Sequence, residues 1–78
     1  MNIKELIQYI AQTMVDNPGE VSISVIEGDQ TTVLELKVAK NDLGKIIGKQ
    51  GRNAQAIRTI LSAVSAKIKK RMILEIIE

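Results

Sequence analysis

The sequence lacks several residue types on which catalysis and metal binding usually depend. Its 78 residues include no cysteine, histidine, phenylalanine or tryptophan. Without cysteine, the chain can form neither a disulfide nor a thiolate metal site. Without histidine, it lacks the most frequent general base and the commonest metal ligand. We therefore expect a protein that is not an enzyme, with no catalytic residue, metal, cofactor or small-molecule substrate.

Long hydrophobic runs are missing as well. No apolar stretch approaches the roughly 20 residues of a membrane span, and the first residues lack the apolar centre of a signal peptide. We therefore expect a soluble, cytoplasmic protein without a membrane partner. The length predicts one domain over residues 1–78 with one small core.

Acidic residues are scarce in one part of the chain. Residues 1–36 carry one base and six acids, whereas residues 37–71 carry ten bases and one acid, Asp42. Basic charge gathered in one segment is expected where the partner is a polyanion. A solvated helix face is the alternative explanation for the charge alone.

Hydrophobic periodicity predicts six elements in the order α-β-β-α-α-β. Apolar residues recur at helical spacing over 2–15, where Asn2 is expected to cap the helix and Pro18 to prevent its continuation. They alternate over 20–27 and 31–39, which predicts a hairpin around Gly28-Asp29-Gln30. The inward-facing strand residues are expected to be Val21, Ile23, Val25, Leu34, Leu36 and Val38.

The basic half of the chain contains the other three elements. A short helix is predicted over 43–47, with Asn41 or Asp42 as its cap. A longer helix is predicted over 52–69, and a β-branched closing strand over 71–77. The apolar face of the longer helix is expected to comprise Ala54, Ile57, Ile60, Leu61, Val64 and Ile68.

Two glycines flank a basic-polar pair between these helices, and we call Gly48-Lys49-Gln50-Gly51 the glycine corner. Glycine is required where the backbone takes a positive φ or approaches a ligand closely. The N–H groups around Gly51 and in the next helical turn are expected to lack intrahelical acceptors and to bind a phosphate. Lys49 and Arg52 add full positive charges there.

A P-loop is the enzymatic alternative for this segment. Gly44-x-x-x-Gly48-Lys49 matches that motif weakly, because the spacing is one residue short and Gln50 replaces the required Ser or Thr. No paired carboxylates accompany it. The segment therefore favours binding over catalysis.

The wider pattern Ile46-Ile47-Gly48-Lys49-Gln50-Gly51-x-x-Ala54-x-x-Ile57 lies between two predicted helices, after a hairpin and before a closing strand. This combination resembles a KH domain, and the element order is that of its type II form. Nearly the whole chain is similar to the KhpA family of small stand-alone bacterial KH proteins. The resemblance implies an α+β fold with a three-stranded mixed sheet and three helices on one face.

The resemblance also implies a function. The glycine corner would clamp the backbone of about four nucleotides of single-stranded RNA, and one of Ile46 and Ile47 would line the groove while the other packs inward. Family members act as RNA chaperones or post-transcriptional regulators, form homodimers or pair with a larger KH-containing partner, and are linked to cell shape and elongation. The residues expected to bind RNA are Lys45, Ile46, Ile47, Gly48, Lys49, Gln50, Gly51, Arg52 and Arg58.

Three questions stay open at the level of the sequence. A KH fold can serve as a protein-interaction scaffold, and a phosphate clamp can accept single-stranded DNA. The basic residues Lys67, Lys69, Lys70 and Arg71 either complement a helix C-terminus or form a second phosphate contact. Tyr9 is the only aromatic residue, so stacking worth about 1–3 kcal/mol per base is missing, and we expect micromolar or weaker affinity with low sequence specificity.

Overall fold

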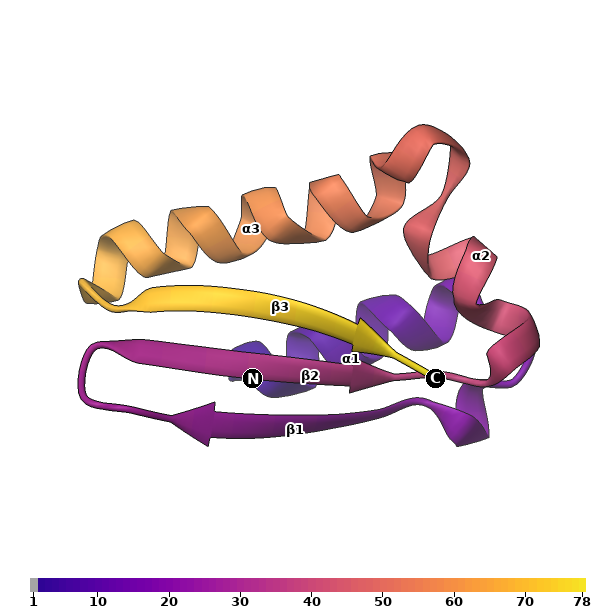
Figure 1. The fold of residues 1–78 in the computed structure, drawn as a ribbon, viewed down its shortest axis with the longest axis horizontal. Helices are drawn as coiled ribbons and strands as arrows, with labels where there is room; N and C mark the ends of the chain where they lie inside the picture. The colour runs from indigo at the N-terminus through magenta and orange to yellow at the C-terminus, as the bar shows by residue number, and fades with distance from the viewer. Residues whose placement is uncertain (1) are drawn as a thin grey trace.

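The computed structural model describes residues 2–78, which form three helices and one three-stranded sheet in the predicted order (Figure 1). Single turns of 3₁₀ helix cover 18–20, 40–42 and 49–51. The helices and strands are α1 (Ile3–Met14), β1 (Ser22–Glu27), β2 (Thr31–Lys37), α2 (Leu43–Ile47), α3 (Arg52–Ile68) and β3 (Arg71–Ile77).

The sheet has the strand order β1-β2-β3 and is mixed. β1 pairs antiparallel with β2 through the predicted hairpin, in which the Gly28 N–H donates to the Thr31 carbonyl at 2.7 Å. β3 lies parallel to β2, a pairing that requires a crossover connection, and α2 and α3 form that crossover. The expectation of a mixed three-stranded sheet is confirmed.

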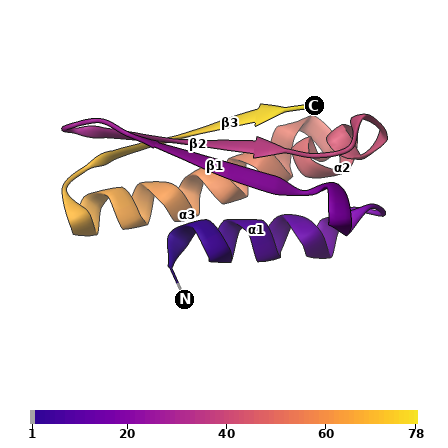
Figure 2. The same ribbon diagram turned by 90° about the horizontal axis from the view of Figure 1, so that it is seen from below.

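All three helices lie on one face of the sheet, as Figure 2 shows. The alternate residues of β2 that face them are buried, and Leu34 and Leu36 have no exposed surface. The opposite face is uncovered, and there Ile26, Val33 and Ile73 stand in register across the three strands. The expected α+β fold, with three helices on one face of a mixed sheet, is therefore confirmed.

The core forms where the helices meet the covered face of the sheet. α1 begins as predicted, because the Glu5 N–H donates to Asn2 Oδ1 at 2.8 Å and so satisfies one of the free donors of the first turn. Burying each large aliphatic side chain in this layer contributes roughly 1.5–3 kcal/mol. The buried core residues are Ile7, Ala11, Val21, Ile23, Leu34, Leu36, Val38, Ile46, Ile57, Leu61 and Leu74.

The core is narrower than the periodicity predicted. Val25 and Ile60 are each 37% exposed, and Ile68 is 48% exposed. Figure 2 shows that the hairpin end of the sheet and the C-terminal end of α3 both extend past the start of α1. Val25 and Ile68 therefore lie beyond the start of α1, the helix that would otherwise cover them.

Asp42 differs most from its expected role. It stands at the N-cap position of α2, but its side chain makes no cap hydrogen bond. Its Oδ1 accepts from the Asp16 N–H at 3.2 Å, and its Oδ2 accepts from the Asn17 N–H and Asn17 Nδ2, both at 3.0 Å. The residue is only 1% exposed. Asp42 thus fastens the segment after α1 to the start of α2.

These contacts also set the ionisation of Asp42. Burial alone would raise the pKa of its carboxyl group, but the hydrogen bonds from Asn17 and from the Asp16 N–H, with the positive charge of Lys45, lower the pKa below its ordinary value. A carboxyl group whose pKa is lower in the folded than in the unfolded chain stabilises the fold at neutral pH. That contribution is lost as the pH falls below the ordinary Asp value of about 3.9 and through the folded value.

We predict that Asp42→Asn lowers the midpoint of thermal unfolding at pH 7 by several degrees, because an amide nitrogen would face a backbone N–H. The difference from the parent should shrink as the pH falls below about 4. Circular dichroism melts over a pH series measure both effects. Asp16→Asn is the control, since its side chain is exposed and its backbone N–H is kept. Equal midpoints for Asp42→Asn and the parent at pH 7 would refute the role of Asp42.

Candidate nucleic-acid interface

The glycine corner joins α2 to α3 and projects from one end of the molecule (Figure 1). α2 ends at Ile47, directly before the corner, and α3 begins at Arg52, directly after it. A helix of five residues is not stable alone in water. The position of the corner therefore depends on the contacts that hold both ends of α2.

Gly48 ends α2 in a conformation that only glycine adopts readily. Its φ of 78° and ψ of 173° lie in a region closed to residues with a Cβ atom. A Cβ atom there would also stand 2.6 Å from the Cγ atom of Asn53. Gly48 is therefore required both by the turn itself and by a close neighbour.

Gly51 is required for a different reason. Its φ of 74° and ψ of 13° are left-handed, but a Cβ atom at this position would meet nothing within 4 Å. Gln50 before it is also left-handed, with a φ of 58°. The space in front of Gly51 is therefore open, so a sugar-phosphate strand can approach its backbone.

The N–H groups without acceptors differ from those that we predicted from the sequence. The Gly51 N–H donates to the Gly48 carbonyl at 3.1 Å, and the Arg52 N–H donates to the Lys49 carbonyl. The expectation that these two groups lack acceptors was wrong, because a 3₁₀ turn forms at the corner. No hydrogen-bonded turn spans Gly48, so the N–H groups of Lys49 and Gln50 have no local acceptor. The N–H groups without a local acceptor are therefore those at the tip of the corner.

Asn53 holds the corner closed, and the sequence did not indicate this role. Its Nδ2 donates to the Lys45 carbonyl at 2.9 Å, which ties the last turn of α2 to the first turn of α3. The carbonyls at a helix end lack intrahelical partners, so an asparagine nearby in the sequence was the available signal. No fixed spacing rule would have selected Asn53 over the other polar residues around it.

The two isoleucines before the corner take separate roles. Ile46 is fully buried in the core, whereas Ile47 is 39% exposed beside the corner. This difference settles which of the pair packs inward. Ala54 is 3% exposed and belongs to the buried face of α3.

The cationic side chains of the expected site are not equivalent. Lys49 and Arg52 are exposed at the corner, and Arg52 Nη2 donates to Gln50 Oε1 at 3.3 Å. Lys45 forms an ion pair with Asp16 Oδ2 at 3.1 Å on an exposed surface, where such pairs contribute little. Arg58 Nη2 lies 3.5 Å from the Leu74 carbonyl and so reaches toward β3. The structure brings Lys49, Gln50 and Arg52 together at the corner, whereas the side chains of Lys45 and Arg58 contact groups outside it.

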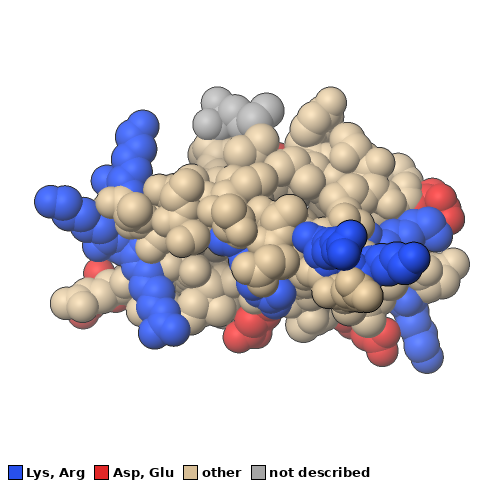
Figure 3. Space-filling model, turned by 90° about the horizontal axis from the view of Figure 1, so that it is seen from above, with Lys and Arg blue, Asp and Glu red and all other residues tan. Residues whose placement is uncertain are grey.

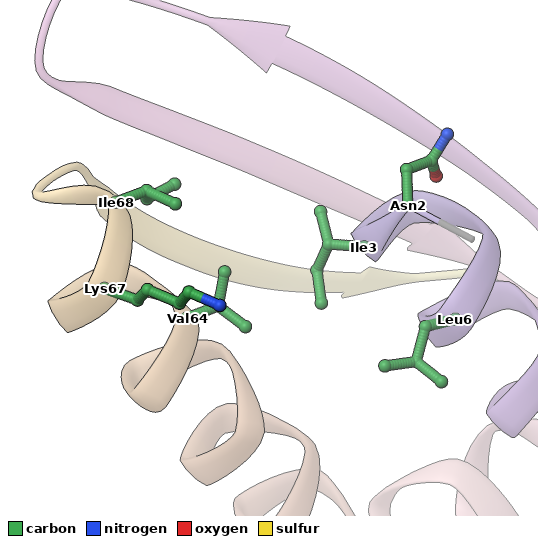
Figure 4. Close-up of a pocket in the computed structure, with 6 residues that line it drawn as sticks. All are labelled: Asn2, Ile3, Leu6, Val64, Lys67 and Ile68. Carbon is green, nitrogen blue, oxygen red and sulfur yellow. The ribbon is translucent and has the colours of Figure 1, made fainter.

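Residues 2–78 contain a pocket but neither a metal site nor a membrane-spanning helix. Residues 2–78 contain no group of three or more carboxylates placed to hold a metal ion. No helix in the described part of the chain has both the length and the apolar character needed to cross a membrane. An open pocket of about 360 Å³ lies between the start of α1 and the end of α3, remote from the corner (Figure 4). It is lined by Asn2, Ile3, Leu6, Val64, Lys67 and Ile68.

The fold and the glycine corner define a KH domain of type II. Comparison with known proteins agrees, since the KhpA/KhpB KH-domain profile matches residues 4–76. The chain belongs to this family.

Close relatives cover almost the whole chain. The RNA-binding protein KhpA of Caldanaerobacter subterraneus is 56% identical over 94% of this chain and 97% of its own length. The KhpA proteins of Clostridium acetobutylicum and Aquifex aeolicus are 52% and 50% identical over 96% and 97% of this chain, and over 100% and 96% of their own lengths.

A more distant protein shares the fold. The chain superimposes on part of Era, in a crystal structure with MgGDPNP and nucleotides 1506–1542 of 16S ribosomal RNA, with a TM-score of 0.59 and 18% identity. The match covers 96% of this chain and 29% of that one. At this identity the likeness concerns the fold alone.

We predict that the two corner glycines differ in their tolerance of alanine. Gly48→Ala should lower the free energy of unfolding by roughly 2–3 kcal/mol, because it combines a disallowed φ and ψ with a clash against Asn53. Gly51→Ala should cost about 1 kcal/mol, the strain of a left-handed residue in open space. Urea denaturation measures both values, and equal costs would contradict this account.

The contact between Gly48 and Asn53 can be isolated in a double-mutant cycle. Shortening Asn53 to alanine removes two of the three atoms that a Cβ at position 48 would strike, Cγ and Nδ2, and leaves the Cβ of residue 53 at 2.8 Å. The cost of Gly48→Ala should therefore be smaller in the Asn53→Ala background than in the parent. Strict additivity of the two substitutions would show that Asn53 does not constrain Gly48.

Proposed function

We propose that this chain binds single-stranded RNA through the glycine corner. One observation carries the proposal: the N–H groups of Lys49 and Gln50 are unbonded at an exposed tip that also presents the side chains of Lys49 and Arg52. Relatives that are about half identical over nearly the full length are named RNA-binding proteins, which supports the same ligand.

The corner would hold the strand by its backbone. A phosphate oxygen accepts from the two tip N–H groups, and hydrogen bonds of this kind to a charged acceptor are short and strong. Lys49 and Arg52 neutralise phosphate charge and release counterions. The missing side chain at Gly51 lets the sugar-phosphate chain pass close to the protein.

Bases would meet an aliphatic surface. Ile47 is partly exposed beside the corner, and Ile46 beneath it belongs to the core, which keeps α2 in place. Tyr9 is 60% exposed but lies on α1 and not on the helices that form the corner. With no aromatic platform, affinity for one domain is micromolar or weaker and depends little on base sequence.

Broader roles are proposed from the family resemblance. They comprise a cytoplasmic location, RNA-chaperone or regulatory activity, self-association or pairing with a larger KH protein, and a part in cell shape and elongation. A dimer would strengthen a weak single-site clamp by avidity.

The decisive variant is Lys49→Asp with Gln50→Asp, which places two carboxylates where the phosphate is held. We predict at least a tenfold loss of affinity for a fluorescent single-stranded RNA, measured by anisotropy, with an unchanged circular dichroism spectrum. Lys4→Asp with Ser22→Asp is the matched control, because it makes the same change in charge at exposed positions of α1 and β1, outside the corner and the two helices that it joins.

The same assay separates the alternatives. A folded corner variant that binds RNA as well as the parent would refute the clamp. A parent that binds no single strand would favour the protein-interaction scaffold. Equal affinity for the deoxyribose oligonucleotide of the same sequence would extend the ligand to single-stranded DNA, since phosphate contacts do not require the 2′-hydroxyl.

A further inference from the structure

A second concentration of positive charge lies at the other end of α3. Residues 43–74 contain eight bases and no acid, and four of the bases fall within five positions where α3 turns into β3. Figure 3 shows the side of the molecule on which α3 lies in Figure 1. Lys and Arg side chains gather at both ends of this side, and acidic side chains lie along its edges. We call the four residues the basic end: Lys67, Lys69, Lys70 and Arg71.

The charges of the basic end are not neutralised within the fold. Among residues 2–78, none of its four side chains forms an ion pair with a carboxylate. Like charges this close together repel one another, which destabilises the folded chain. A partner that carries negative charge would remove that repulsion.

The helix end does not need this much charge. Only Lys67 lies in the last turn of α3, the region where a cation complements the terminal carbonyls. The backbone is closed by other groups, because the Lys69 N–H donates to the Ser65 carbonyl at 2.9 Å and the Ser65 hydroxyl donates to the Lys70 carbonyl. A structural role at the helix terminus therefore leaves three of the four cations unexplained.

Lys69 occupies a position that favours glycine. Its φ of 59° and ψ of 35° are left-handed, the conformation in which helices usually end with a glycine. A lysine there strains the backbone, so the chain keeps a charge at this place at a cost in stability. A residue that lowers the stability of the fold and makes no stabilising contact in exchange is expected at a binding site.

The geometry connects the basic end to the glycine corner. α3 has 17 residues, so it separates the two by about 25 Å as a rigid spacer. Small or polar side chains are exposed along one stripe of the helix between them, and none carries negative charge. The stripe comprises Ala56, Thr59, Ala63 and Ala66.

We propose that the basic end binds phosphates of the same single-stranded RNA that the glycine corner clamps, so that the strand runs along α3. The proposal rests on the proposed function and extends its site from about four nucleotides to a longer strand. The second contact then acts at high effective concentration once the corner is occupied. The two ends bind cooperatively only when the RNA is long enough to reach both.

The test compares oligouridylates of four and twelve nucleotides by anisotropy over a range of salt concentrations. The variant combines Lys67→Gln, Lys69→Gly and Lys70→Gln. We expect the affinity for the twelve-nucleotide strand to fall at least fivefold, with the salt slope reduced by about 0.7 for each lost phosphate contact. Affinity for the four-nucleotide strand should stay unchanged.

Lys69→Gly alone should raise the midpoint of thermal unfolding while it weakens binding of the longer strand.

Two controls make each outcome decisive. Lys4→Gln, Lys37→Gln and Lys40→Gln remove the same number of charges from exposed positions outside the basic end. An equal loss in this control, an equal loss for both strand lengths, or no loss in the basic-end variant would each overturn the proposal. Lys49→Asp with Gln50→Asp should lower the affinity at least tenfold at both lengths. If the parent binds neither strand, the proposed function itself fails, and this inference fails with it.

Discussion

The turn at Gly48 is the constraint on which the rest of the site depends. Its positive φ with an extended ψ ends α2 abruptly, and Asn53 packs so closely against it that no side chain would fit. The turn breaks the helical hydrogen-bond ladder, which leaves the N–H groups of Lys49 and Gln50 without local acceptors. The same feature that shapes the corner therefore also creates its donors.

The corner keeps its shape because α2 is fastened at both ends. At its start, Asp42 accepts three hydrogen bonds from the segment after α1, and at its end the Lys45 carbonyl accepts from Asn53. Ile46 anchors the middle of the helix in the core. A five-residue helix that could not persist alone thus becomes a rigid support, and donors held in advance would lose little entropy in the phosphate contact that we propose.

The sequence predicted the features that depend on neighbouring residues. The element order, the hairpin, the Asn2 cap and the closing strand follow from periodicity and turn chemistry, and the structure agrees with them. The bonds of Asp42 to Asp16 and Asn17 were not predictable, because partners about 25 residues apart meet only after folding. The amides of Gly51 and Arg52 were misplaced because the sequence does not show that a 3₁₀ turn would occupy them.

Titration of the isotopically labelled protein with a short single-stranded RNA, followed by amide NMR, tests the central claim most directly. The account predicts that the backbone N–H signals of Lys49 and Gln50 move first and furthest, while those of the uncovered sheet face around Val33 stay in place. Large shifts confined to that sheet face, with the two corner amides unmoved, would contradict it.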